Sequence, residues 1–152
     1  MIIREATITY KKGQRIESVD ALNSPEKIYS VAKHFLANHD PEKEHFCVIA
    51  MDRKNKCKGI NLVSTGTLTS SLVHPREVFK SLILQSASAF VCFHNHPSGD
   101  PAPSRADIQV TRQLREAAQI IGIDFLDHII IGEPEDDCNG NGYYSFNDGG
   151  LI

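Results

Sequence analysis

The residues best suited to chemistry lie at positions 94–107, where the sequence reads HNHPSGDPAPSRAD. His94 and His96 stand two residues apart at the end of an apolar run, residues 89–94, that predicts a strand. Residues at i and i+2 of a strand point to the same face, so both imidazoles can reach one ion. Neutral imidazole is a favoured zinc ligand. Because the chain has seven histidines, the pair alone is also compatible with a structural role.

The loop after the histidines strengthens the case for a metal. Residues 97–103 hold three of the seven prolines together with Gly99, which predicts a rigid, sharply turning segment. Ser104 and Asp107 then form a capping-box pattern at the start of a helix predicted over residues 105–121. On local grounds alone, Asp107 is expected to act as a helix cap. Presented back toward the two histidines, the same carboxylate would complete a three-ligand catalytic zinc site with a fourth position for water. The predicted ligands of one zinc ion per chain are His94, His96 and Asp107.

Hydrolysis at such a site also requires a general base, normally a carboxylate. Spacing alone does not choose among the candidate acids, which are Glu42, Glu44, Glu77 and Asp127. Two imidazoles and a carboxylate also discriminate weakly between zinc and other divalent ions.

Other polar residues receive mainly structural interpretations. His45 and His128 lie in apolar strands and are expected to be hydrogen-bonded core residues, although either one can also orient a ligand. Asp127 is the better candidate for a partner of a ligand, because a carboxylate beside a buried strand needs one. His74 precedes Pro75 at a helix start. Asn95 faces away from the ligands and is expected to hold a neighbouring loop.

Hydrophobic patterns predict strands and helices that alternate along the chain. Strands are expected at residues 2–10, 45–53, 59–65, 89–94, 124–132 and 143–146, and helices at 24–38, 74–88 and 105–121. The acidic, Gly- and Asn-rich residues 133–142 predict an exposed loop. This order favours an α/β or mixed α+β single domain with one central sheet flanked by helices.

Composition narrows the function classes. The 152 residues suffice for one domain, and a hydrophobic fraction of 41% is that of a globular protein. A net charge of -3 argues against a dedicated nucleic-acid binder, and the basic residues at 53–58 predict a solvated hairpin tip. The four cysteines show no C-x-x-C pair, which argues against a disulfide framework. With neither a signal-peptide pattern nor a spanning apolar run, the expected location is cytoplasmic, without a membrane partner.

The string HNHPSGDPAPSRAD resembles the signature of the JAB/MPN metalloenzyme (JAMM) superfamily. That signature is an upstream Glu, His-x-His-Pro, a Ser, and an Asp after a ten-residue gap, here residues 97–106. The longer stretch of sequence from GTLTSSLVHPREVF to DHIIIG resembles the bacterial RadC-like branch of this superfamily. The resemblance implies a JAB/MPN, cytidine-deaminase-like fold, with residues 41–152 as the metallohydrolase core and residues 1–40 as a strand and helix of the same domain. It also implies zinc-dependent cleavage of peptide or isopeptide bonds, with Glu44 as general base and Ser104 steadying the water or the oxyanion.

One departure from the family bears on function. Full-length RadC-like proteins carry a helical, helix-hairpin-helix-like segment before this domain, where this sequence has a strand and a helix. The sequence thus resembles a stand-alone form, which weakens any DNA-binding role assigned through that segment. The alternative hypothesis is a non-catalytic or DNA-associated module in DNA repair or recombination. A metal-dependent nuclease or a small-molecule deaminase is a third hypothesis, and the deaminase lacks its Pro-Cys-x-x-Cys motif.

Overall fold

A computed structural model describes residue 9, residues 21–66 and residues 73–152. Apart from Thr9, the strand expected at residues 2–10 lies outside the described residues. The described elements are α1 (Pro25–Leu36), β1 (His45–Met51), β2 (Cys57–Thr65), α2 (Pro75–Leu84), β3 (Ala89–Asn95), α3 (Arg105–Ile121), β4 (Asp124–Ile131) and β5 (Tyr143–Ser145).

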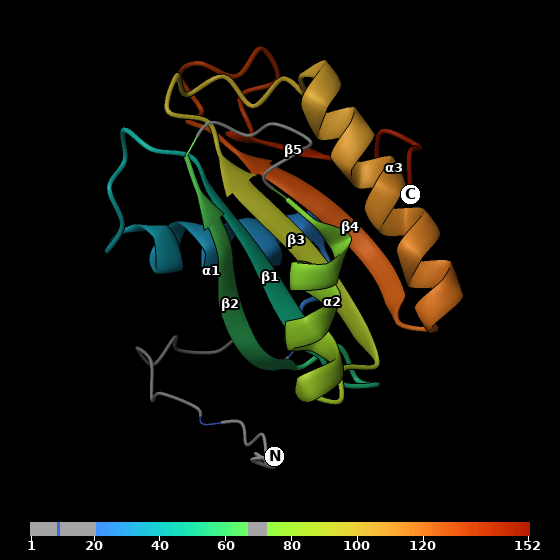
Figure 1. Cartoon of the computed structure of the whole chain (residues 1–152). Coiled ribbons are helices and arrows are strands. Elements are labelled where there is room, and N and C mark those ends of the chain that lie inside the picture. Colours follow the sequence, from blue (N-terminus) through green and yellow to red (C-terminus); the bar gives the residue numbers. More distant parts are fainter. Residues whose placement is uncertain (1–8, 10–20, 67–72) are drawn as a thin grey trace.

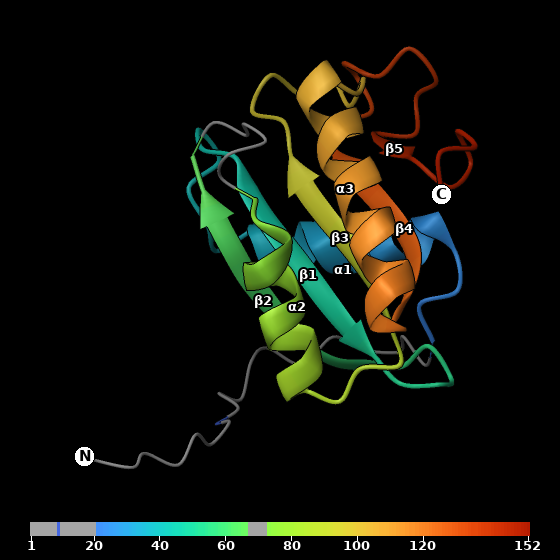
Figure 2. The same cartoon turned by 45° about the vertical axis from the view of Figure 1, so that its right-hand side comes forward.

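The strands form one mixed sheet in the order β2-β1-β3-β4-β5. The pair β3 and β4 is parallel, and the other neighbouring pairs are antiparallel. Helix α1 covers one face of the sheet, whereas α2 and α3 cover the other (Figure 1 and Figure 2). This is a single α+β domain with a central mixed sheet flanked by helices, which confirms the predicted fold class.

Both faces of the central strands are buried, as the apolar runs predict. Every residue of β1 is buried. Alternate side chains enter the two core layers: Cys47, Ile49 and Met51 pack on the α1 side, and Phe46, Val48 and Ala50 pack on the side of α2 and α3. In β3, Phe90 and Cys92 also face α2 and α3. Because side chains alternate along a strand, His94 continues that series and points toward the layer that contains α3.

The helix ends are set by local backbone geometry. Helix α2 ends at Leu84, four residues before the predicted end at Ser88, so that prediction was too long. The reason is Ser86, which adopts a left-handed φ of 50° and turns the chain toward β3. Helix α3 has its predicted bounds and ends at Gly122, whose φ of 78° is the left-handed C-terminal conformation that favours glycine. No helix in the described ranges is long and apolar enough to cross a membrane.

Candidate metal centre

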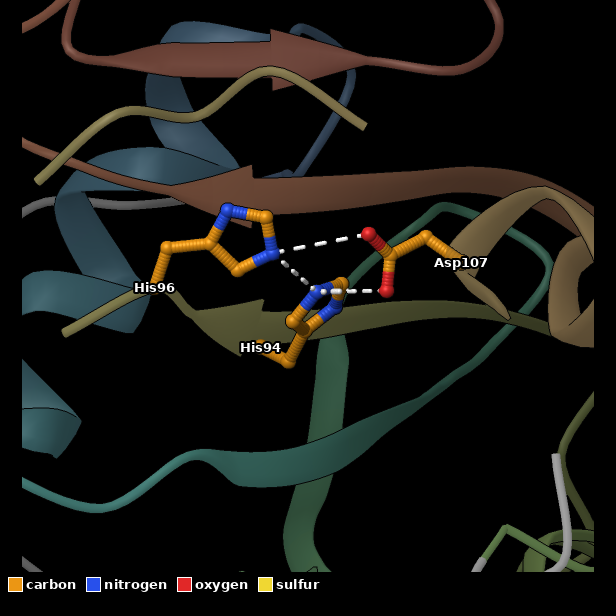
Figure 3. Close-up of side chains that lie close together, drawn as sticks. All are labelled: His94, His96 and Asp107. Atoms are coloured by element: carbon orange, nitrogen blue, oxygen red, sulfur yellow. Dashed lines mark hydrogen bonds and ion pairs between the residues drawn. The ribbon is translucent and has the colours of Figure 1, made fainter. Parts of the chain in front are cut away.

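The structure brings together the three predicted metal ligands (Figure 3). One nitrogen of His94, one nitrogen of His96 and one carboxylate oxygen of Asp107 all lie within 4.8 Å of one another. His94 Nε2 lies 3.2 Å from Asp107 Oδ1, and His96 Nε2 lies 3.5 Å from Asp107 Oδ2. The two Nε2 atoms are 3.1 Å apart. All three side chains therefore direct their ligand atoms at one small volume.

Strand β3 positions both histidines at the end of the sheet. His94 pairs with Phe46 of β1 and with Ile130 of β4, so it is fixed from both sides. His96 follows the strand end, where its backbone N–H donates to the carbonyl of Ile131 at 2.9 Å. His94 is fully buried, whereas the side chain of His96 is 15% exposed. The candidate centre is therefore reached from solvent on the His96 side.

The proline-rich loop is held by the segment that follows β4. Gly99 adopts a φ of 85°, and its carbonyl accepts the N–H of Glu133 at 2.8 Å. Gly132 packs against the loop so closely that a Cβ there would collide with the carbonyl oxygen of Gly99 and with Pro101. This contact needs glycine, because no other residue leaves the required space. The two loops thus form one packed unit beside His96.

The start of α3 positions Asp107. The N–H of Ser104 donates to Asp107 Oδ2 at 2.7 Å, and the N–H of Asp107 donates to Ser104 Oγ at 3.2 Å. This reciprocal pair is a capping box, which confirms the local prediction. The Asp107 side chain is only 1% exposed, and its Oδ1 remains directed at His94. Asp107 therefore caps the helix and faces the histidines at the same time.

The electrostatics of the site favour an ionised Asp107. Burial opposes its charge, but the close contacts with His94 and His96 and the hydrogen bond from the Ser104 N–H outweigh burial and hold the pKa of the Asp107 carboxyl well below its usual range. Burial lowers the pKa of His94, although the nearby Asp107 acts to raise it. Burial also disfavours a charge on His96, yet the close contact with Asp107 and the hydrogen bond to the Asp100 carbonyl raise the pKa of His96. A metal requires an ionised carboxylate and neutral imidazoles, and Asp107 and His94 already have those forms at neutral pH.

Comparison with known proteins identifies the family. The RadC-like JAB domain profile matches residues 22–151. The chain belongs to the RadC-like JAB domain family. A UPF0758 protein of Trichlorobacter lovleyi is 43% identical over 141 residues, which cover 93% of this chain and 57% of that relative. A UPF0758 protein of Caldanaerobacter subterraneus is 52% identical over 105 residues, 68% of this chain and 45% of the relative. A third, from Bacillus licheniformis, is 55% identical over 93 residues, 61% of this chain and 42% of the relative.

The family assignment confirms the predicted resemblance. The matched part of this RadC-like JAB domain spans at most 57% of the length of these three relatives. The names of these relatives state no activity, substrate or partner.

Among the four acids proposed as general base, Glu44 lies electrostatically close to the ligands. Its charge raises the pKa of both His94 and His96. Glu44 is half-buried directly before β1, and its carbonyl accepts the N–H of Gly66 at 2.9 Å. By contrast, Glu42 and Glu77 are exposed. The position of Glu44 in this RadC-like JAB domain is compatible with the role that the resemblance implies.

Asp127, the fourth acid, has a structural role away from the ligands. Its Oδ2 accepts the hydroxyl of Ser145 at 2.6 Å. Its Oδ1 accepts the backbone N–H groups of His128 and Asn147 at 2.7 and 3.0 Å. Burial raises the pKa of Asp127 against these hydrogen bonds. The prediction that Asp127 is the partner of a ligand was wrong, because its carboxylate ties β4 to the segment after β5.

His128 is the residue that contacts a ligand. Its Nε2 lies 2.9 Å from Nδ1 of His94, and both side chains are fully buried. The sequence pattern favoured a core role for His128 and kept the orientation of a ligand as the alternative, and the structure shows both. The missing information was the pairing of β4 with β3, in which His128 lies opposite Cys92 and so faces the same layer as His94.

The remaining polar residues have the expected structural roles. His45 is buried, and its ring bonds to Thr65 Oγ1 at 3.1 Å and to the Asp40 carbonyl at 2.8 Å. His74 is the exposed residue directly before the first turn of α2. Asn95 holds a neighbouring segment, as expected, and that segment is the one containing Glu44.

Proposed function

We propose that this RadC-like JAB domain is a zinc-dependent hydrolase that cleaves peptide or isopeptide bonds in a peptide or protein substrate. The observation that carries the proposal is the convergence of His94, His96 and Asp107 within 4.8 Å, with Glu44 acting electrostatically on both histidines. The choice of an amide bond rests on the resemblance of the signature to JAMM enzymes. A net charge of -3 does not support a nucleic acid as the substrate.

The donor set fits a divalent metal. His96 Nδ1 lies 2.8 Å from the carbonyl oxygen of Asp100, which only accepts hydrogen bonds, so this nitrogen carries the ring proton. The Nε2 atom of neutral His96 therefore offers a lone pair toward the carboxylate of Asp107. Lone pairs and carboxylate oxygens that face one another need a cation between them. Two imidazoles and one carboxylate form a donor set of catalytic zinc sites.

Zinc in this site would supply Lewis acidity toward water and toward the carbonyl of the scissile bond. In the proposed reaction, Glu44 accepts the proton of the attacking water and delivers it to the leaving amine. Ser104, exposed at the N-terminus of α3, steadies the water or the developing oxyanion with its hydroxyl. The partly exposed His96 marks the side from which water and substrate arrive.

The test compares Glu44→Gln with Glu42→Gln. Both replace one acid by its amide within three residues, but only Glu44 acts on the ligand histidines. The expected result is that Glu44→Gln still binds zinc but loses the cleavage of a peptide and isopeptide library, whereas Glu42→Gln keeps both. Undiminished cleavage by Glu44→Gln would remove Glu44 from the mechanism. Cleavage that is insensitive both to zinc removal and to His96→Ala would overturn the metal-dependent proposal.

A further inference from the structure

A chain of buried hydrogen bonds connects two of the proposed ligands through residues outside the metal motif. His94 Nδ1 lies 2.9 Å from His128 Nε2. His128 Nδ1 lies 2.7 Å from Thr111 Oγ1. Thr111 Oγ1 in turn donates to the carbonyl of Asp107 at 2.7 Å. Thr111, His128 and His94 are each fully buried, so these contacts are screened from bulk water.

The direction of each hydrogen bond follows from the carbonyl at the end of the chain. A carbonyl oxygen only accepts, so the single hydroxyl proton of Thr111 is committed to Asp107. The hydroxyl oxygen must therefore accept from His128 Nδ1, which carries the proton of that ring. The ring of His128 is fully buried against Phe46 and Phe146, an apolar setting that disfavours a charged imidazolium, so its Nε2 is an acceptor. His94 Nδ1 must then be the donor.

Aromatic packing holds the rings in this arrangement. Phe146 stacks on His128 with ring centroids 4.8 Å apart and an interplanar angle of 12°. Phe46 stacks on His94 at 6.0 Å and meets His128 edge-on at 5.5 Å. Both phenylalanines are fully buried. Since Phe46 and Phe146 enclose the ring of His128, its nitrogens have few alternatives to His94 and Thr111 as partners.

We propose that Thr111 and His128 are positioning residues that fix the tautomer of His94, so that its Nε2 presents a lone pair to a divalent metal. With the proton of His94 held on Nδ1, Nε2 is the atom that lies 3.2 Å from Asp107 Oδ1. The partner that orients a metal-binding histidine contributes to affinity without touching the metal. Because Thr111 also donates to the backbone of Asp107, the same series of hydrogen bonds holds both His94 and Asp107 in place. For its affinity readout this inference rests on the proposed zinc site.

The first measurement is the tautomer of His94 in the metal-free wild-type protein. Long-range ¹H–¹⁵N NMR spectra above neutral pH distinguish a proton on Nδ1 from a proton on Nε2. The inference expects His94 with its proton on Nδ1 and His128 likewise. A His94 ring with its proton on Nε2 would overturn the inference, whether or not the protein binds zinc. This readout therefore separates failure of the inference from failure of the proposed function.

The second measurement is zinc affinity by chelator competition in three variants. Thr111→Val removes the hydroxyl at nearly constant volume, and Thr111→Ser retains it. Ser145→Ala removes a buried hydroxyl that, within the described part of the chain, bonds to Asp127 and to the N–H of Asp148. The expected result is a loss of about 10- to 100-fold in affinity for Thr111→Val. Thr111→Ser and Ser145→Ala should stay near the wild type. Wild-type affinity in a folded Thr111→Val would contradict the positioning role.

Discussion

The side-chain amide of Asn95 bridges the backbone on both sides of Glu44. Its Oδ1 accepts the N–H of His45 at 2.8 Å, and its Nδ2 donates to the carbonyl of Lys43 at 2.8 Å. Asn95 lies between the two ligand histidines in sequence, at the end of β3. Asn95 therefore connects the backbone around the proposed base to the strand that carries the proposed ligands.

Replacement of Asn95 tests this connection. In Asn95→Ala both hydrogen bonds are lost, and we expect a destabilisation of about 1–3 kcal/mol, because each typical bond contributes roughly 1 kcal/mol. Zinc should remain bound, since Asn95 is not a ligand, while cleavage falls by at least about tenfold as Glu44 loses its fixed position. Zinc content, chemical unfolding and turnover are measured on the same preparation. A variant that is destabilised yet cleaves at the wild-type rate would show that Asn95 does not position Glu44.

The contact between Gly132 and the proline-rich loop gives a second test. A Cβ at position 132 would displace the loop through Gly99 and Pro101, and with it the backbone that carries His96. We expect Gly132→Ala to weaken zinc binding although it changes no ligand, as measured by chelator competition.

A matched control for Gly132→Ala lies in the same part of the chain. Gly140 has open space around its Cβ position and a φ of 72°, a conformation that asparagine tolerates. Gly140→Asn should therefore keep wild-type zinc affinity. Equal losses in both variants would mean that the loop as a whole, rather than the contact at Gly132, controls the site.

The stability of the metal-free protein should depend on pH through its buried histidines. Burial lowers the pKa of His94 and of His128, whose ordinary value is 6.5. Below that pH the unfolded chain binds more protons than the folded one, so the free energy of unfolding falls as pH falls. Each histidine contributes up to roughly 1.4 kcal/mol per pH unit. His96 has a raised pKa, so its contribution to the free energy of unfolding has the opposite sign. The contributions of His94 and His128 together are expected to exceed it.

Urea unfolding between about pH 7.5 and 5.5 measures this dependence. His34→Gln replaces an exposed histidine of α1 and should leave the slope unchanged. A free energy of unfolding that stays constant or rises toward acid pH would contradict the assignment of His94 and His128 as buried neutral residues.

Local sequence rules predicted where the three ligand side chains lie, and the resemblance to the JAMM signature selected them as a ligand set. The period of a strand places His94 and His96 together, and the capping box places Asp107 in the first turn of α3. The helix α3 was predicted to the residue because Ser104 and Gly122 mark its two ends. The alternation of strands and helices predicted one central sheet flanked by helices, and the strand directions come from the structure.

Those local rules do not predict which strands pair or in which register. The choice between Asp127 and His128 depends on the register of β4 against β3, which no local pattern contains. The distinction of Glu44 from the other acids depends on β1 lying beside β3, with Phe46 opposite His94. The early end of α2 depends on Ser86, a residue whose type does not signal a left-handed conformation.

The central claim is most directly tested by the metal content of protein purified without added metal, measured by mass spectrometry beside His96→Ala. The account predicts about one zinc per wild-type chain, as in catalytic sites with three protein ligands, and a clear loss in the variant. Absence of a bound divalent metal from the wild type, even after incubation with zinc, would contradict the account and leave His94, His96 and Asp107 as a structural hydrogen-bonded cluster.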